Sequence, residues 1–155
     1  GHVSATIAVG TNPMTPVLAP DGTLYVPNNL DNTVSVIRNG RVTTTITVGK
    51  YPTTPALAPD GTLYVPNFGD STVSVIKDGH ITTTITVGKK PTTPAVAPDG
   101  TVYVTNNDDG TVSVIKDGHI TTTITVGKRP TTPAVAPDGT VYVANNGDGT
   151  VSVLS

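Results

Sequence analysis

The 155-residue sequence contains no cysteine, tryptophan, glutamate or glutamine, and its only aromatic residues are five tyrosines and one phenylalanine. The lack of cysteine excludes a disulfide framework and any zinc site that uses cysteine ligands. All 11 acidic residues are aspartates. The straight-chain residues that favour helices are therefore scarce, which argues against an α-helical fold.

Charge and hydropathy exclude two classes of partner. The net charge is −2 at pH 7, so there is no broad basic field, and we expect no nucleic-acid partner. No uninterrupted run of 18 apolar residues is present, so we expect no membrane partner. The N-terminus lacks a basic segment followed by an apolar one, so we expect no signal peptide, and the compartment is left open.

What the sequence does contain is β-branched residues and turn formers. There are 30 threonines, 23 valines, 16 glycines and 14 prolines. Threonine and valine favour strands, whereas glycine and proline favour turns. This composition predicts an all-β protein.

The sequence repeats with a period of 39 residues. The segment Pro-Asp-Gly-Thr begins at Pro20, Pro59, Pro98 and Pro137, with no insertion or deletion between copies. The chain can be divided into units 1–39, 40–78, 79–117 and 118–155, which we interpret as one domain of four repeats. Such uniformity indicates either recent duplication or human design.

Each unit reads as four short strands. For the third unit and the start of the fourth, we expect strands at 92–97, 101–105, 111–115 and 120–126. Asp117-Gly118 predicts a tight hairpin between the last two strands. Tyr103 alternates with Val102 and Val104, so it lies on the opposite face of its strand.

A period near 40 residues with four strands per unit is typical of a β-propeller blade. One such sheet cannot bury both of its faces, so neighbouring blades must cover it. We expect the four strands to run from the inner to the outer edge of the blade, because proline and small residues fit a crowded inner strand.

A specific resemblance follows from Tyr103-Val104-Thr105-Asn106 together with 110–115, Gly-Thr-Val-Ser-Val-Ile. Related tetrads occur at 25–28, 64–67 and 142–145. This pattern resembles the YVTN family of β-propeller repeats and covers nearly the whole chain. The resemblance implies a propeller fold. The family includes surface-layer proteins, extracellular repeat modules and some enzymes, and its members usually have about seven blades, whereas four repeats are present here.

Ring closure has two alternatives. Residues 3–9 align with an outer strand, and 151–154 align with a third strand, so the first segment can complete the last blade. The residues expected in this closure are Val3, Ile7, Val9, Val151 and Val153. Either four blades close within one chain, or two chains form an eight-bladed homodimer. We favour the dimer, because compact blades with small side chains suit shallow wedging in a wide ring.

Two sets of residues are candidates for a binding site at the channel mouth. The loops before the inner strands carry Lys50, Lys89 and Lys128, which could attract an anion or instead be solvated and paired with nearby aspartates. The inner strands carry Thr15, Thr54, Thr93 and Thr132, whose hydroxyls could hold a polar guest or simply face water.

We expect no metal and no cofactor. The loop 106–110 offers amide and carboxylate oxygens of the kind that bind Ca²⁺, but it matches no twelve-residue calcium loop and also reads as a polar turn. His2, His80 and His119 occupy one aligned position, so they would lie a blade apart.

The sequence contains no recognisable catalytic motif, and we predict that the protein is not an enzyme. The first hypothesis is a self-assembling structural scaffold. The alternative is a multivalent module that binds a protein or glycan partner through the loop face carrying Lys50, Lys89 and Lys128. A glycan site generally includes an aromatic side chain, so a repeated site would need one in each repeat. The loops contain only two aromatic residues, Tyr51 and Phe68. A lyase or lactonase, as the family resemblance allows, is the third hypothesis.

Overall fold

The computed structural model describes residues 1–155 and contains only strands, turns and loops. Blade 1 consists of β1 (Val17–Leu18), β2 (Leu24–Asn28), β3 (Thr33–Arg38) and β4 (Arg41–Thr47). Blade 2 consists of β5 (Ala56–Leu57), β6 (Leu63–Asn67), β7 (Thr72–Lys77) and β8 (His80–Thr86). Blade 3 consists of β9 (Ala95–Val96), β10 (Val102–Asn106), β11 (Thr111–Lys116) and β12 (His119–Thr125). Blade 4 consists of β13 (Ala134–Val135), β14 (Val141–Asn145) and β15 (Thr150–Leu154).

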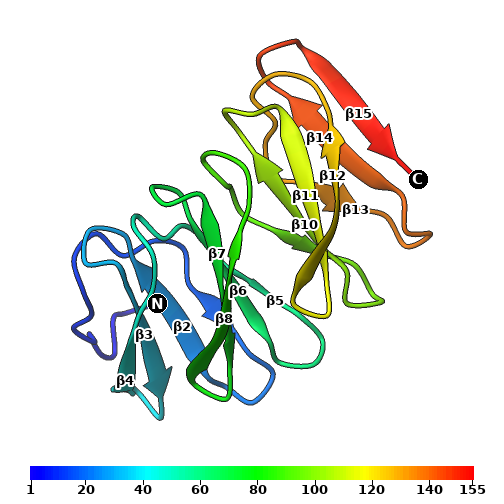
Figure 1. Ribbon diagram of the computed structural model, residues 1–155. Coiled ribbons are helices and arrows are strands. Elements are labelled where there is room, and N and C mark those ends of the chain that lie inside the picture. The colour runs from blue at the N-terminus through cyan, green and yellow to red at the C-terminus, as the bar shows by residue number, and fades with distance from the viewer.

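Each blade is one antiparallel sheet whose strands follow chain order. The four blades succeed one another along an open arc, with β2 and β15 near its two ends (Figure 1). The all-β prediction is confirmed, and the strands match the expected pattern. The structure contains no helix with the length and apolar character needed to cross a membrane.

The innermost strand is shorter than expected. Residues 92–97 were predicted as one strand, but β9 covers only Ala95–Val96, and Pro91 adds an isolated bridge to Asn106. The reason is that Pro91 and Pro94 have no backbone N–H, so they cannot donate to the ladder.

The backbone adopts the tight turns that the Asp-Gly pairs predict. Asp78-Gly79 and Asp117-Gly118 all have positive φ, as a type I′ turn between the last two strands requires. Next to this hairpin, the register between the third and fourth strands shifts in each complete blade, for example between Val114 and Ile115. This shift is a β-bulge, which increases the local twist of the outer edge.

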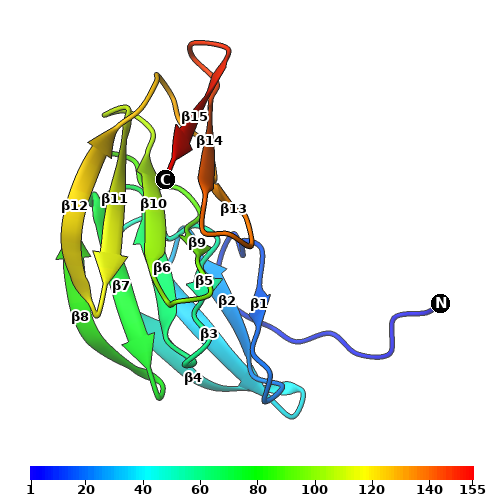
Figure 2. The same cartoon turned by 90° about the vertical axis from the view of Figure 1, so that its right-hand side faces the viewer.

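The closing strand is not formed within this chain. Residues 3–9 were expected to lie at an outer edge, but no strand precedes β1, and Val3 is 83% exposed. The segment runs away from the blades (Figure 2). Blade 4 accordingly has three strands, and β15 pairs only with β14. A four-bladed ring closed within one chain is therefore not what the structure contains.

The hydrophobic core lies between successive blades. Between blades 2 and 3, Tyr64, Val73 and Val75 pack with Val102 and Val104 in one cluster. Equivalent clusters join blades 1 and 2 and blades 3 and 4. Both faces of blades 2 and 3 are thus covered by neighbours, as the repeat architecture requires.

A buried asparagine organises each blade at the edge opposite the Pro-Asp-Gly turns. These asparagines end the second strand and are almost inaccessible: Asn28, Asn67, Asn106 and Asn145. In blade 3, the Nδ2 of Asn106 donates to Thr111 Oγ1 and Ser113 Oγ, both at 2.9 Å. The asparagine side chain therefore joins the second strand to the third beyond the backbone ladder.

A glycine packs directly on each of these asparagines. A Cβ on Gly88 would approach the Cγ of Asn106 to 2.6 Å, so only glycine fits the connection that enters blade 3. In blade 1 the same connection also donates from Gly10 N–H to Asn28 Oδ1, at 3.1 Å. The buried asparagine therefore sets where each blade's inner connection lies.

We predict that Asn106→Ala lowers the free energy of unfolding by about 2–3 kcal/mol, because the hydroxyls of Thr111 and Ser113 lose a buried partner. Urea or guanidinium titration followed by circular dichroism measures the change. Asn146→Ala is the matched control, because that side chain is exposed and should change stability by less than about 0.5 kcal/mol. Equal effects from the two variants would contradict the prediction.

Candidate functional site

A pocket of about 600 Å³ lies between blades 2 and 3, on the face that carries the Pro-Asp-Gly turns and the outer hairpins. We call this pocket the inter-blade groove and this face the turn face. Fifteen residues line the groove, and only three are hydrophobic. They are Ala58, Pro59, Asp60, Thr62, Tyr64, Val75, Lys77, Thr82, Thr83, Asp99, Gly100, Lys116, Asp117, Gly118 and His119.

Two ion pairs form the opposing walls of the groove. In blade 2 the Nζ of Lys77 lies 3.0 Å from Asp60 Oδ2, and in blade 3 the Nζ of Lys116 lies 3.0 Å from Asp99 Oδ2. Each lysine ends a third strand, and each aspartate sits in the turn between the first and second strands. The 39-residue repeat thus places the same pair on two successive blades.

Each aspartate is also held in place by hydrogen bonds from a neighbouring threonine, in addition to its contact with the lysine. Asp99 Oδ1 accepts the backbone N–H of Thr101 at 3.0 Å, and Asp99 Oδ2 accepts the Thr101 hydroxyl at 2.9 Å. The Thr101 backbone hydrogen bond and then the Lys116 ammonium lower the pKa of Asp99 to about 2. The same causes, through Thr62 and Lys77, lower the pKa of Asp60. Both carboxylates remain charged throughout the neutral range.

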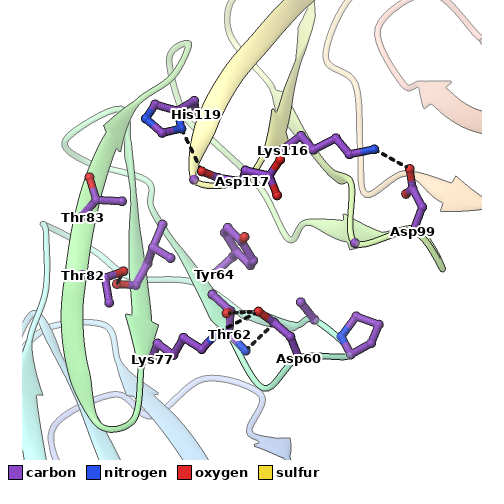
Figure 3. A pocket seen from close by; sticks show the side chains of 15 residues that line it. Asp60, Thr62, Tyr64, Lys77, Thr82, Thr83, Asp99, Lys116, Asp117 and His119 are labelled. Carbon is purple, nitrogen blue, oxygen red and sulfur yellow. Dashed lines mark hydrogen bonds and ion pairs between the residues drawn. The ribbon is translucent and has the colours of Figure 1, made fainter.

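Tyr64 lines the groove with the small part of its surface, 6%, that is exposed. It is drawn between the two ion pairs in Figure 3, and its side chain also belongs to the apolar cluster between blades 2 and 3. Burial, followed by the nearby carboxylates of Asp60 and Asp117, raises the pKa of its phenol. The phenol therefore stays neutral and can both donate and accept a hydrogen bond.

The outer hairpin of blade 3 closes one side of the groove. The Nδ1 of His119 lies 2.8 Å from the carbonyl oxygen of Asp117. Since a carbonyl oxygen can only accept, Nδ1 carries the proton in the neutral ring, and Nε2 is left as an acceptor. On the facing strand β8, Thr82 and Thr83 line the pocket, and the Thr82 hydroxyl donates to Val75 O at 3.2 Å.

The predicted lysine set lies on the opposite face, which we call the loop face. Lys50, Lys89 and Lys128 are exposed, and their backbone N–H groups donate to Asp70, Asp109 and Asp148 at 2.7, 2.8 and 2.6 Å. Lys128 and Asp148 also line a pocket of about 480 Å³ on that face. That these lysines bind a ligand stays a prediction.

The predicted threonine set is divided between two environments. Thr54 and Thr93 are half-buried, whereas Thr15 and Thr132 are exposed. Next to them along the inner strands, Leu57, Val96 and Val135 line a separate pocket together with three prolines. The inner edge of the arc is therefore more apolar on the turn face than the threonines alone predict.

The fold does not arrange the loop 106–110 or the histidines as a metal site. Asn106 is buried and bonded to Thr111 and Ser113, so its side chain is turned away from loop 107–110. His80 and His119 sit on different hairpins, and no three His, Asp, Glu or Cys side chains gather as metal ligands do.

Two kinds of functional residue were missed by reading the sequence. Tyr64 was treated only as a strand residue, although a tyrosine occurs at the same position in every repeat and faces away from its strand neighbours Leu63 and Val65. Asn106 was assigned to a polar loop, although it ends a strand and is fully buried. Strict recurrence of Tyr and Asn at two fixed positions was the signal that could have identified both.

Comparison with known proteins shows the fold. No protein-family model matches the chain, and no curated protein does. Among solved structures, hydrazine synthase of Kuenenia stuttgartiensis matches with a TM-score of 0.78 and 26% identity, over 99% of this chain and 53% of that one. Virginiamycin B lyase of Staphylococcus aureus matches with a TM-score of 0.79 and 16% identity, over 94% of this chain and 56% of that one. A streptogramin B lyase matches with a TM-score of 0.81 and 16% identity, over 94% of this chain and 51% of that one.

The chain is a β-propeller-like protein. It spans about half the length of these solved structures. The prediction of a non-catalytic scaffold is wrong, because these structural neighbours include enzymes and nothing shows a scaffold role. The alternative, a multivalent module on the loop face, gains no support from them. A shared fold does not by itself assign an activity.

We predict that the carboxyl group of Asp99 titrates near pH 2, and that Lys116→Met raises its pKa without restoring the ordinary 3.8, because the larger contribution of the Thr101 N–H remains. Since the folded pKa is depressed, Asp99 stabilises the fold above about pH 4. That contribution is lost as pH falls towards 2. Carbon-detected NMR titration of the carboxyl group measures the midpoint.

Asp138 is a natural control for this titration. It has the same backbone hydrogen bond, from Thr140 at 2.9 Å, but Ser155 stands where the lysine would be. Its pKa is lowered mainly by that hydrogen bond. In the Lys116→Met variant, Asp99 should behave as Asp138 does. A midpoint for Asp99 that returns fully to 3.8 would show that the lysine dominates instead.

Proposed function

We propose that this chain binds a small polar molecule in the inter-blade groove, within a YVTN-type β-propeller whose ring is completed by a second copy. The observation that carries the binding proposal is the groove itself, a pocket of about 600 Å³ with two preformed ion pairs as walls and the Tyr64 side chain between them. Binding sites are typically concave, with a few polar groups held in place in advance.

The groove is rigid enough to act as a binding site. Its aspartates lie in tight turns and are held in place, because each accepts a hydrogen bond from the threonine that immediately precedes the second strand. Tyr64 is held in the packed core between the blades. A ligand would therefore meet groups that are already oriented, which lowers the entropic cost of binding.

The exposed face of blade 4 supports completion of the ring by a second copy. Tyr142, Val151 and Val153 are 44%, 59% and 59% exposed. The aligned residues of blade 2, Tyr64, Val73 and Val75, are buried against the next blade. Because blade 1 resembles blades 2 to 4, the blade 1 of a second copy has the shape to cover this face. Two such contacts generate an eight-bladed ring with C2 symmetry.

Charge at the two ends is complementary. Asp138 of blade 4 has no ion-pair partner, since Ser155 replaces the lysine found in blades 2 and 3. Blade 1 carries Arg38 and Arg41 at the positions of Lys116 and His119, and neither arginine forms an ion pair within the chain. In the proposed ring these arginines lie on the wall opposite Asp138, where Arg38 also donates from Nε to Thr23 Oγ1 of its own blade at 3.0 Å. Residues 3–9 of one copy then supply the outer strand that blade 4 of the other lacks.

We expect the protein to have twice its 15.8 kDa chain mass in solution by size exclusion with light scattering. Val153→Lys should abolish the larger species, because it places a charge in an apolar junction. Thr123→Lys is the matched control, on an outer strand that stays exposed to solvent in the ring. A wild-type mass of one chain, or a dimer that tolerates Val153→Lys, would argue against the ring.

Binding in the groove can be tested by nitrogen–proton NMR with a library of small polar molecules. We expect saturable shifts at Thr83 and Gly118, which line the groove from blade 2 and from blade 3. Thr83→Trp should reduce affinity at least about tenfold by filling the pocket. Thr122→Trp, at the aligned position of blade 3, should leave those shifts unchanged. A library without any saturable groove binder would refute the proposed function.

A further inference from the structure

We infer that the ligand of the inter-blade groove is a neutral, polyhydroxylated molecule, a saccharide unit that lies between the two lysine–aspartate pairs. This inference rests on the proposed function and names the class of its ligand. The reasoning depends on which hydrogen-bonding groups of the groove are already used and which are free.

An anion is disfavoured by the state of the lysines. Lys77 and Lys116 each have a carboxylate oxygen at 3.0 Å, so neither offers an uncompensated positive charge. Three aspartates line the pocket against these two lysines. A phosphate or carboxylate ligand would have to displace a protein carboxylate that is already fixed by a threonine N–H.

A compact cation is disfavoured by the same pairing. The carboxylates of Asp60 and Asp99 are compensated, which leaves Asp117 as the one lining carboxylate without an ion-pair partner. No three acidic or histidine side chains converge on one point. A cation beside Asp117 would also share the pocket with the ammonium groups of Lys77 and Lys116.

An apolar ligand is disfavoured because twelve of the fifteen lining residues are not hydrophobic. Filling the groove with an apolar group would strip water from two ion pairs without replacing its hydrogen bonds, and that desolvation is costly. The ring of Tyr64 offers little apolar surface to a ligand, because its side chain is only 6% exposed.

A polyol fits what remains. Each lysine ammonium has three donors and uses one on its aspartate, so each wall still has donors to offer. Thr83 is not engaged in a hydrogen bond by its hydroxyl, and the Nε2 of His119 is a free acceptor. Hydrogen bonds to charged groups are stronger and more directional than neutral ones, so hydroxyls on neighbouring carbons of a sugar can bridge a lysine and its aspartate.

Tyr64 adds one more hydroxyl to the groove. Its side chain is only 6% exposed, so its ring packs in the core and leaves no open aromatic face for a sugar ring. Because the pKa of the phenol is raised, the hydroxyl remains protonated and can donate a hydrogen bond to a ligand or accept one from it.

The test compares three classes of probe by NMR titration of the wild-type protein: neutral hexoses, N-acetylhexosamines and their disaccharides; sulfate and acetate; and tetramethylammonium. We expect saturable shifts at Thr83 and Gly118 with a neutral saccharide, and an affinity that changes less than about twofold between 50 and 500 mM salt. The ionic probes should give no saturable shift in the groove.

Two variants distinguish the groove from other surfaces. Tyr64→Phe keeps the ring and removes the hydroxyl, and we expect affinity to fall about threefold to tenfold. Lys116→Met removes one wall's donors and should weaken binding by about tenfold or more. Tyr51→Phe is the matched control, because Tyr51 is exposed and lies outside the groove. Circular dichroism establishes that each variant is folded.

The outcomes separate this inference from the proposed function. If sulfate, acetate or tetramethylammonium saturates the groove and no saccharide does, the ligand class is wrong and the binding site stands. If no probe of any class produces saturable shifts there, both proposals fail. A saccharide whose affinity is unchanged by both Tyr64→Phe and Lys116→Met binds elsewhere and also overturns the inference.

Discussion

The buried asparagine at the end of each second strand is the constraint on which the remaining architecture depends. Its Nδ2 spans the second and third strands, and a glycine of the incoming connection packs on its side chain. The same connection is held to the preceding blade, for example by Val48 N–H to Asn32 O at 2.9 Å. Each linker is thus fixed at both ends, to the blade it leaves and the blade it enters. This fixes the spacing and rotation from one blade to the next, because the linker has little freedom left.

The groove follows from that spacing. Near the middle of the blades the facing sheets are close enough for valine and isoleucine to pack, whereas on the turn face the gap is left to Tyr64 and the charged residues. Tyr64 takes part in both environments, since its ring belongs to the core and also faces the pocket. Function and stability are therefore coupled at this residue. Changes to the walls are less constrained, because the lysine–aspartate pairs are about half exposed and contribute little to stability.

What could be predicted from sequence was what the repeat encodes locally. The strands, the Asp117-Gly118 hairpin and the arrangement of loops on two faces follow from alternation, turn chemistry and period. The role of Asn106 could not be predicted in this way, because a polar residue before a loop reads as solvated unless its partners are known. The site at Tyr64 was missed for a related reason. Alternation placed the aligned Tyr103 opposite to Val102 and Val104, but only the neighbouring blade shows where the gap between two sheets leaves a pocket. The fate of residues 3–9 likewise depends on a neighbour, since an outer strand needs a sheet edge to join.

In a chain of nearly identical blades, only the residues that differ can distinguish one junction from another. The apolar clusters between blades recur with similar residues, so they favour every junction equally and cannot by themselves determine which blade follows which. Arg38, Arg41 and Ser155 break this equivalence at the two ends. If Lys stood at 155, Asp138 would be compensated within its own blade, as Asp60 and Asp99 are, and would offer no charge to a partner. With serine there, the carboxylate of Asp138 has no lysine partner, and in the proposed ring it lies opposite a wall that carries two arginines, Arg38 and Arg41. Specificity of this kind arises from a few polar differences placed on a common apolar interface, which selects the partner while the apolar residues supply the affinity.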